Sequence, residues 1–225
     1  MTNTNPIRVV QCWDDGVTDD IRLIEILRKH GAKASFNLNA ALHKNDSGPA
    51  WRYKDIKDVL RIPRGDLVSV YDGFLIANHT ATHPWLTKIT PAEAEREIRD
   101  GKDALEQLFG YPVMGFAYPF GGYNPAIEEM VRAAGHVYAR TCVNVADVFP
   151  PQNPMAFHAN CHFHAKDFWD RFNHVATEGG VFYFWGHSYE IVTEDDWTAF
   201  DRQIGVLSAN PRVRWVDLPG LFAVS

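Results

Sequence analysis

Cysteine is scarce in this sequence. There are three in 225 residues, Cys12, Cys142 and Cys161, and no two of them form a C-x-x-C pair. Cysteine-rich zinc sites and disulfide-stabilised domains need closely spaced or paired cysteines, so the sequence excludes both classes. We expect each cysteine to be a small buried apolar residue in a protein of a reducing compartment.

Long hydrophobic runs and clusters of positive charge are missing too. No apolar run approaches the roughly 20 residues that cross a bilayer, so no membrane partner is expected. The 22 lysines and arginines are scattered among 28 acidic residues, which gives a net charge of −6 and no basic face for nucleic acid. The first six residues, MTNTNP, lack the basic and apolar regions of a signal peptide, so we expect a cytoplasmic protein. No pattern indicates an oligomeric state.

The remaining composition is that of an ordinary globular domain. Hydrophobic residues make up 46% and charged residues 22% of the chain, both close to the average for soluble proteins. Short apolar runs, each followed by an amphipathic segment, recur along the whole length, which is typical of βα units around a parallel sheet. We therefore predict a single α/β domain over residues 1–225, a length common for α/β barrels.

The expected elements follow from these runs and from their start and stop signals. Thr90, Pro91 and Glu93 predict a capped helix start, and Gly110 ends that helix. The stretch 144–160, rich in proline and asparagine, predicts a long loop. Strands are expected at 7–13, 34–39, 67–70, 75–78, 115–118, 137–140, 181–185 and 214–216, and helices at 19–30, 91–109, 125–134, 166–178 and 194–210.

Polar side chains fall at or just past the carboxyl ends of several expected strands. Active sites of parallel α/β proteins are built at this end of the sheet, so we expect four separate segments to converge there. The residues are Asp14, Asp15, His79, His83, Arg140 and His187.

Asp14 and Asp15 are adjacent carboxylates followed by Gly16, which permits a tight turn. Adjacent side chains diverge, so the two carboxylates can have different roles. The alternative is that one of them caps the helix that begins nearby. The pattern alone does not choose between them.

His79 and His83 are four residues apart in the run HTATHP. They would share one face if the chain turned helical after the strand, and the spacing then suits two ligands of a divalent metal. Two unrelated histidines on a turn are the alternative. Thr80 replaces the glutamate of the H-E-x-x-H pattern, so a zinc-protease motif is absent. With an aspartate from another strand end, a site of two histidines and one carboxylate is favoured.

His187 follows an apolar strand, where a shifted pKa would suit a general acid. A hydrogen-bonded structural histidine is the alternative. The run Cys161-His162-Phe163-His164 is explained by alternation along a strand or loop, and no second metal is expected there.

Taken together, these motifs resemble those of the polysaccharide deacetylases with NodB homology, carbohydrate esterase family four. The family motif T-F-D-D-G resembles residues 12–16, and H-S/T-x-x-H-P resembles residues 79–84. The motif R-x-P-Y-G resembles residues 117–121, and L-x-H resembles residues 185–187. The four motifs occur in the family's order.

The resemblance implies a distorted, incomplete (β/α) barrel related to the TIM barrel. Asp15, His79 and His83 would bind one divalent ion, zinc or alternatively Co²⁺, Ni²⁺ or Mn²⁺. Asp14 would be the general base and His187 the general acid, and the backbone N–H of Phe120 would help to hold the oxyanion. The implied reaction is metal-dependent hydrolysis of a non-peptide amide, N-deacetylation of an acetylated sugar or small glycan.

Three departures from the family pattern affect the expected site. The third-motif arginine is Ala117 here, and we expect Arg140 to supply that charge beside Asp14. The fifth-motif leucine is Trp185, which would narrow or rearrange the acyl pocket, towards formyl. The fourth motif, which orients the acid, is not found, and its candidates are His162, His164 and Asp217.

Aromatic residues near the expected mouth would contact a small-molecule or oligosaccharide substrate by stacking on sugar rings, although core packing is the alternative for most of them. They are Trp13, Trp85, Tyr118, Tyr123 and Trp185. A sugar-binding pseudoenzyme and a metal-independent cyclic-amide hydrolase are the alternative functions. The retained Asp14 argues against the first, and the complete metal trio argues against the second.

Overall fold

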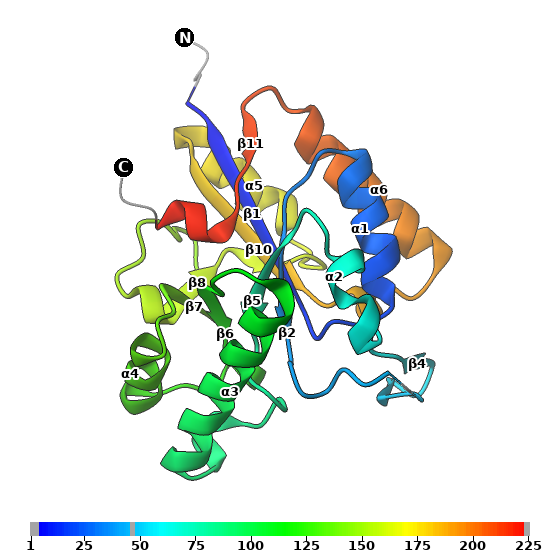
Figure 1. The fold of residues 1–225 in the computed structure, drawn as a ribbon. Helices are drawn as coiled ribbons and strands as arrows, with labels where there is room; N and C mark the ends of the chain where they lie inside the picture. Colours follow the sequence, from blue (N-terminus) through cyan, green and yellow to red (C-terminus); the bar gives the residue numbers. More distant parts are fainter. Residues whose placement is uncertain (1–4, 46–47, 223–225) are drawn as a thin grey trace.

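A single mainly parallel sheet forms the centre of the computed structural model, which describes residues 5–45 and 48–222 (Figure 1). Within these residues the strand order is β8-β7-β6-β5-β2-β1-β10-β9, with β11 also paired to β1, and every pair in this sheet is parallel. The strands are β1 (Ile7–Asp14), β2 (Ser35–Leu38), β5 (Leu75–Asn78), β6 (Gly115–Ala117), β7 (Tyr138–Asn144), β8 (Phe157–Ala159), β9 (Cys161–His162), β10 (Gly180–Gly186) and β11 (Val213–Trp215).

The two edges of this sheet come together at one residue. The edge strands β8 and β9 are consecutive in the chain and are separated by Asn160 alone. Asn160 exchanges hydrogen bonds with Tyr183 of β10, through its backbone N–H and its side-chain Oδ1, both at 2.7 Å. The sheet is therefore nearly closed, which confirms the expected distorted (β/α) barrel and its single domain architecture.

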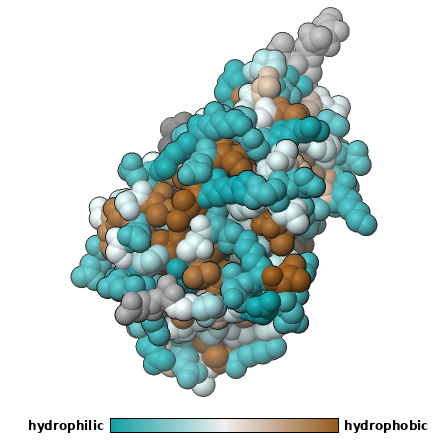
Figure 2. All heavy atoms as spheres, turned by 90° about the vertical axis from the view of Figure 1, so that its right-hand side faces the viewer, coloured by the Kyte–Doolittle hydropathy of each residue, from teal (hydrophilic) through white to brown (hydrophobic). Residues whose placement is uncertain are grey.

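Six helices pack around the outside of the sheet in the described part of the chain (Figure 1). Helices α1 and α6 lie side by side, and α3 and α4 form a second pair. The face that carries α1 and α6 is covered mainly by hydrophilic side chains, with apolar patches between them (Figure 2). The helices are α1 (Asp19–Lys29), α2 (Leu67–Val70), α3 (Pro91–Phe109), α4 (Pro125–Ala133), α5 (Phe168–Glu178) and α6 (Glu194–Ala209).

Strand β1 is buried on both faces, as is usual for a central parallel strand. Val9 packs in the large cluster between the sheet and the helices, whereas its neighbour Val10 packs in a second cluster with Tyr183 and Phe157. Successive side chains point to opposite faces of a strand, so this alternation separates the outer core from the barrel interior. Cys12 and Cys161 are buried as expected, but Cys142 is exposed, because it lies in the part of β7 that leaves the core.

Two expected elements are wrong. Residues 67–70 form the short helix α2 instead of a strand, with Leu67 buried and Val70 packed against the core while Val68 is 47% exposed. A short apolar run has no periodicity that distinguishes these cases. The expected loop at 144–160 contains β8, whose residues Phe157 and Ala159 are fully buried.

A small antiparallel hairpin, which the sequence analysis did not find, lies outside the barrel sheet. It consists of β3 (Trp51–Tyr53) and β4 (Lys57–Val59). In the described residues no helix has both the length and the apolar character to cross a membrane. The expectation of no signal peptide rests on residues 1–6, and the first four of these lie outside the described residues.

The expected start of helix α3 is confirmed in detail. The Thr90 hydroxyl accepts a hydrogen bond from the Glu93 backbone N–H at 3.3 Å, and the Glu93 carboxylate accepts one from the Thr90 N–H at 2.9 Å. Gly110 ends the helix with φ at 75°, a left-handed conformation that glycine adopts without strain.

We expect the substitution Thr90→Ala to lower the free energy of unfolding by about 1 kcal/mol, because it leaves helix N–H groups without their cap. Urea unfolding followed by circular dichroism measures this change. Thr198→Ala is the matched control, since Thr198 lies on an exposed face within helix α6. Equal effects of the two substitutions would contradict a capping role.

Candidate active site

The carboxyl ends of β1, β5 and β10 bring the expected polar residues together with Arg140, which lies inside β7 and not at its end as expected, because that strand continues to Asn144. Asp14 is the last residue of β1 and is paired in register with Asn37 of β2. His79 directly follows β5, and His187 directly follows β10. Four segments of the chain thus meet at one end of the barrel, where catalytic groups of such folds are found.

Asp15, His79 and His83 form a compact group of atoms that could hold a metal ion. The two Nε2 atoms of His79 and His83 are 3.1 Å apart, and Nε2 of His83 is 3.8 Å from Oδ1 of Asp15. One donor atom from each residue lies within 4.8 Å of the other two. Two imidazoles and a carboxylate are a donor set that fits zinc and related divalent ions.

The protonation state of the two histidines suits a metal ligand. Burial lowers the pKa of His79 to about 4 and also lowers the pKa of His83, so both rings are neutral at pH 7. Nδ1 of His79 lies 2.7 Å from the carbonyl oxygen of Ala117, and as a donor there it leaves the lone pair on Nε2. The ring is therefore oriented with its acceptor nitrogen towards Asp15 and His83.

The helical turn that would have placed the two histidines on one face does not form. Thr80 and His83 have φ values of 67° and 61°, so the segment is a loop with two left-handed residues. The Thr80 hydroxyl accepts a hydrogen bond from the His83 N–H at 2.9 Å, and the Asn78 side chain accepts one from the Thr80 N–H at 2.9 Å. These local hydrogen bonds, and not the periodicity of a helix, bring the imidazole rings of His79 and His83 together.

Arg61 and Asn39 connect the two backbone segments that carry these candidate ligand atoms. Arg61 donates to the carbonyl oxygen of Asp15 and to Oδ1 of Asn39, and Asn39 donates to the carbonyl oxygen of His79. Arg61 and Asn39 are buried, and the backbone of Asp15 is left-handed, with φ at 82°. The sequence analysis missed both residues, although Asn39 ends an expected strand as the other site residues do.

Asp14 is buried against a fully buried arginine. Its Oδ1 accepts a hydrogen bond from Asn37 at 2.6 Å, and its Oδ2 accepts one from Arg140. Burial alone would raise the pKa of Asp14, but the charge of Arg140 and the other neighbours hold that pKa well below its usual range. Helix α1 has Thr18 at its N-cap position, so capping by Asp14 or Asp15 is excluded.

His187 lies between Asp14 and Glu190. Its Nε2 is 3.7 Å from Oδ2 of Asp14, and its Nδ1 is 3.3 Å from Oε2 of Glu190. Burial lowers the pKa of His187, but the Glu190 contact and the charge of Asp14 outweigh it and the net shift is upward. Nε2 of His162 also lies 2.7 Å from the Glu190 carboxylate.

Of the three candidates for the missing fourth motif, only His162 belongs to this group in the described structure. Asp217 instead pairs with Lys33 at 2.6 Å, and His164 is exposed. Glu190 was missed, although its position three residues after His187 in a short turn was visible in the sequence. The spacing of three residues, which is typical of a capping contact, is the sequence signal that could have predicted the role of Glu190.

Some of the expected aromatic residues lie in the core, and others lie at the opening of the site. Tyr118 was expected to contact substrate, but its side chain is fully buried and its hydroxyl donates to the Met155 carbonyl at 2.8 Å, so that expectation is wrong. Trp13 is also fully buried. Phe120 is 57% exposed, stacks on Trp85 and lies 4.6 Å from the His83 ring.

Trp185 and Phe120 remain at the opening of the site. Trp185 is half-buried, and the guanidinium of Arg140 lies 4.6 Å from the centre of its ring. Phe120 has a φ of 56°, which is uncommon for a residue with a side chain and is often found at functional sites. Both side chains are therefore available to a molecule that enters the mouth.

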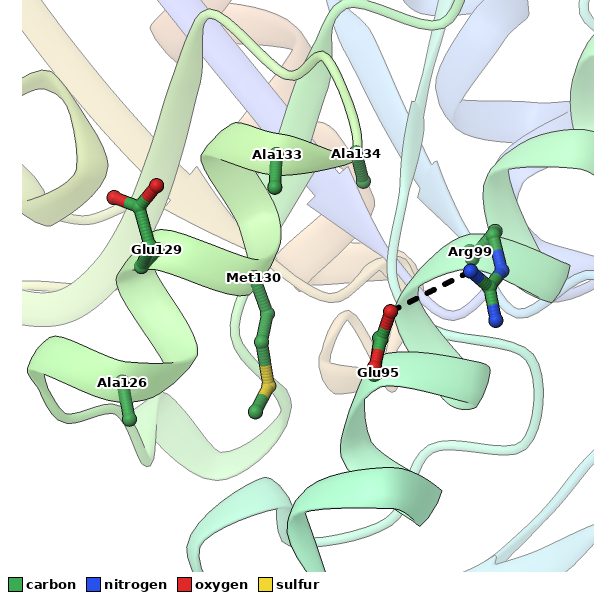
Figure 3. A pocket seen from close by; sticks show the side chains of 7 residues that line it. All are labelled: Glu95, Arg99, Ala126, Glu129, Met130, Ala133 and Ala134. Carbon is green, nitrogen blue, oxygen red and sulfur yellow. Dashed lines mark hydrogen bonds and ion pairs between the residues drawn. The ribbon is translucent and has the colours of Figure 1, made fainter.

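A separate pocket of about 420 Å³ lies between helices α3 and α4 (Figure 3). Met130 points into it, and its charged residues Glu95 and Arg99 pair with each other at 3.4 Å. None of the expected catalytic or metal-binding residues lines it. We therefore assign the candidate site to the carboxyl ends of the strands.

The chain is similar to several known proteins. The family model described as polysaccharide deacetylase matches residues 2–139. The putative polysaccharide deacetylase YxkH of Bacillus subtilis is 28% identical over 129 residues, which are 56% of this chain and 40% of that protein. The peptidoglycan-N-acetylmuramic acid deacetylase PdaC of the same organism is 31% identical over 61 residues, 27% of this chain and 13% of that protein. The chain thus spans less than half the length of these curated relatives.

Solved structures extend the likeness over almost the whole chain. The structure of PdaC from Bacillus subtilis matches with a TM-score of 0.60 and 18% identity, covering 98% of this chain and 92% of that chain. A family 4 carbohydrate esterase from Streptomyces lividans matches with a TM-score of 0.59 and 16% identity, covering 93% and 91%. At this identity the likeness shows a shared fold. Because the family model matches more than half of the residues, including Asp14, Asp15, His79 and His83, the chain belongs to the polysaccharide deacetylase family.

Proposed function

We propose that the chain is a metal-dependent N-deacetylase that hydrolyses the acyl amide of an amino sugar in a polysaccharide, peptidoglycan or smaller glycan. The observation that carries this proposal is the convergence of Asp15, His79 and His83 on one point, with the second carboxylate, Asp14, beside them. The names of the relatives in this family support deacetylation as the reaction.

Asp15, His79 and His83 would hold one divalent ion, with zinc first and Co²⁺, Ni²⁺ or Mn²⁺ as alternatives. When bound, such an ion polarises the amide carbonyl and lowers the pKa of a water molecule. The bonds from Arg61 and Asn39 would keep the two ligand-bearing backbones at a fixed separation. Partners of this kind behind the ligands usually raise metal affinity.

Asp14 would act as the general base. Its low pKa keeps it ionised at neutral pH, so it can accept a proton from the attacking water. Asn37 and Arg140 bond one carboxylate oxygen each, which fixes its orientation. In this assignment Arg140, from β7, supplies the charge that the family's third-motif arginine supplies elsewhere.

His187 would act as the general acid. Water adds to the carbonyl carbon, Asp14 takes one proton from that water, and the carbon–nitrogen bond breaks as His187 gives a proton to the nitrogen. An amide nitrogen leaves poorly as an anion, so this proton is needed. The raised pKa of His187 favours the protonated ring, and Glu190 and His162 would orient it.

Phe120 and Trp185 would shape the acyl side of the site. The backbone N–H of Phe120 is the proposed donor to the oxyanion, by analogy with the third motif, and the left-handed backbone there fits a strained functional turn. Trp185 is bulkier than the family leucine, which would favour a small acyl group such as acetyl or formyl. Trp85 and the Phe120 ring offer an exposed aromatic surface for a sugar.

Two other functions compete with this proposal. A sugar-binding pseudoenzyme would need no ionised Asp14, and a metal-independent cyclic-amide hydrolase would need no complete trio of ligands. A family 4 pseudoenzyme mutant with restored enzymatic activity shares the fold at a TM-score of 0.61 and 16% identity, covering 98% of this chain and 69% of that chain, so fold alone does not separate these cases. Turnover and metal content do.

We expect Asp14→Asn to lower turnover by at least about 100-fold, the usual contribution of a general base, while the metal content stays unchanged. Acetate and formate release from N-acetyl and N-formyl amino sugars and their short oligomers measures turnover, and elemental analysis measures the metal. Chelation should abolish turnover, and one equivalent of Zn²⁺ or Co²⁺ should restore it. Turnover that survives chelation would favour the cyclic-amide hydrolase, and sugar binding without any turnover would favour the pseudoenzyme.

Arg140→Met should destabilise the fold by about 3–5 kcal/mol, because it leaves the buried Asp14 carboxylate without its positively charged arginine partner. The double variant Asp14→Asn with Arg140→Met should recover much of this loss. Arg52→Met is the control, since the exposed Arg52–Asp58 pair should contribute at most about 1 kcal/mol. Equal free energies of unfolding for Arg140→Met and Arg52→Met would contradict a large contribution of the Asp14–Arg140 ion pair to stability.

Glu190→Gln should move the alkaline limb of the kcat profile to lower pH. The pKa of His187 is raised in the fold, so its acid form persists at low pH and disappears as pH rises through that pKa. Removing the Glu190 charge lowers the pKa of His187, so the protonated ring is lost at a lower pH. The profile is measured with one equivalent of metal, and Glu129→Gln, an exposed carboxylate, is the control. An unmoved alkaline limb argues against His187 as the acid held by Glu190.

A further inference from the structure

A second group of donor atoms lies beside the proposed reaction centre. Nε2 of His162 and Nδ1 of His187 both approach Oε2 of Glu190, at 2.7 and 3.3 Å. These three donor atoms lie within 4.8 Å of one another. Their side chains are between 19% and 23% exposed, so a solvated ion has access to them.

The donor types and their spacing suit a divalent cation. Two imidazoles and one carboxylate repeat the chemistry of the group formed by Asp15, His79 and His83. A four-coordinate zinc ion, with bonds of about 2.0–2.2 Å, needs ligand atoms roughly 3.4 Å apart. The His187–Glu190 separation of 3.3 Å already meets this requirement, and the His162–Glu190 separation of 2.7 Å falls short of it by less than about 1 Å. The two imidazole nitrogens lie within 4.8 Å of each other.

Nδ1 of His187 lacks a well-formed hydrogen bond in the described structure. It is shielded from solvent and has no partner of good geometry, although Oε2 of Glu190 lies 3.3 Å away. A buried nitrogen of this kind costs free energy unless something binds it. An ion between the three side chains would bind its lone pair.

We propose that His162, His187 and Glu190 form a second divalent-cation site, and that an ion bound there inhibits the enzyme by capturing His187. The cation-binding half of the proposal stands on these three donors alone. The inhibitory half rests on the proposed function, in which His187 gives a proton to the leaving amine.

The two nitrogens of His187 face different groups, and inhibition follows from this. Nδ1 points to the second cluster, whereas Nε2 lies 3.7 Å from Oδ2 of Asp14. An ion that binds the Nδ1 lone pair displaces any proton on that atom into solvent. The proton on Nε2 is then the only acidic proton left on the imidazole ring. A neutral imidazole gives up that proton far less readily than an imidazolium does, so the acid is lost while the first metal site stays filled.

The sequence analysis expected no second metal at residues 161–164. The structure revises the reason for that expectation, because only His162 of that run contributes a donor. The other two donors, His187 and Glu190, come from the turn after β10, and β9 pairs with β10 in parallel. Spacing within the CHFH run therefore carried no information about this group.

The binding half is tested with Zn²⁺ alone on the metal-free full chain, by calorimetric titration and elemental analysis after dialysis. We expect two ions per chain in the wild type. His162→Asn should keep the tighter site and weaken the other at least 10-fold, and Asp15→Asn should keep the weaker one. His174→Asn is the control for surface binding, since His174 is an exposed histidine 3.6 Å from Asp147, and it should still bind two.

The inhibitory half is tested by adding excess Zn²⁺ to enzyme that already holds one equivalent, with each variant compared with its own activity before the addition. Wild type and His174→Asn should lose at least 90% of turnover as the weaker site fills, and His162→Asn should not. A single ion per wild-type chain, or a weaker site unchanged in His162→Asn, overturns the second site. Equal inhibition of all three proteins overturns the capture of His187. A wild type without turnover at one equivalent would contradict the proposed function instead, and the titration would still decide the second site.

Discussion

A buried ion pair across the barrel is the constraint on which the site depends. Asp14 ends β1 and Arg140 lies in β7, and both side chains are almost completely buried. A charge in such surroundings needs a partner and further hydrogen bonds, which Asn37 provides. Because β1 and β7 are not neighbours in the sheet, the pair also fixes how the two sides of the barrel approach each other. His187 approaches the same carboxylate from β10.

The backbone around the other carboxylate, that of Asp15, is held by hydrogen bonds to main-chain atoms. Asp15, Thr80 and His83 all have left-handed backbones, a conformation that residues with side chains adopt at a cost. The bonds from Arg61 through Asn39 to the His79 carbonyl hold backbone atoms, and the guanidinium of Arg61 also lies 3.9 Å from Oδ1 of Asp15. Both the main chain and the donor side chains are thus oriented by neighbouring groups, as a precise binding site requires.

Much of the fold and of the site could be predicted from the sequence, because their signals are local. Alternation of apolar runs and helices identified the βα units, and the capping signals at Thr90 and Gly110 gave the bounds of α3 correctly. The positions of Asp14, His79 and His187 at strand ends brought these residues to one mouth. Arg140 was expected beside Asp14, and the structure has it there.

What could not be predicted depends on contacts between distant residues. Arg61 takes part through Asp15 and Asn39, which lie on other segments, and nothing in its own sequence neighbourhood marks it. Tyr118 matched a family motif, yet its side chain turns into the core, because adjacent residues on an extended segment face opposite ways. The pairing of β8 with β7 depends on the assembly of the whole sheet, so the proline-rich sequence of residues 144–160 did not predict it.

The closing of the sheet at β8 and β9 also protects the molecule from aggregation. Edge strands are templates for aggregation when they are left open. Since one uninterrupted segment carries both β8 and β9, and Asn160 between them is bonded to Tyr183 of β10, this segment offers little free edge to strands of other molecules in the described structure.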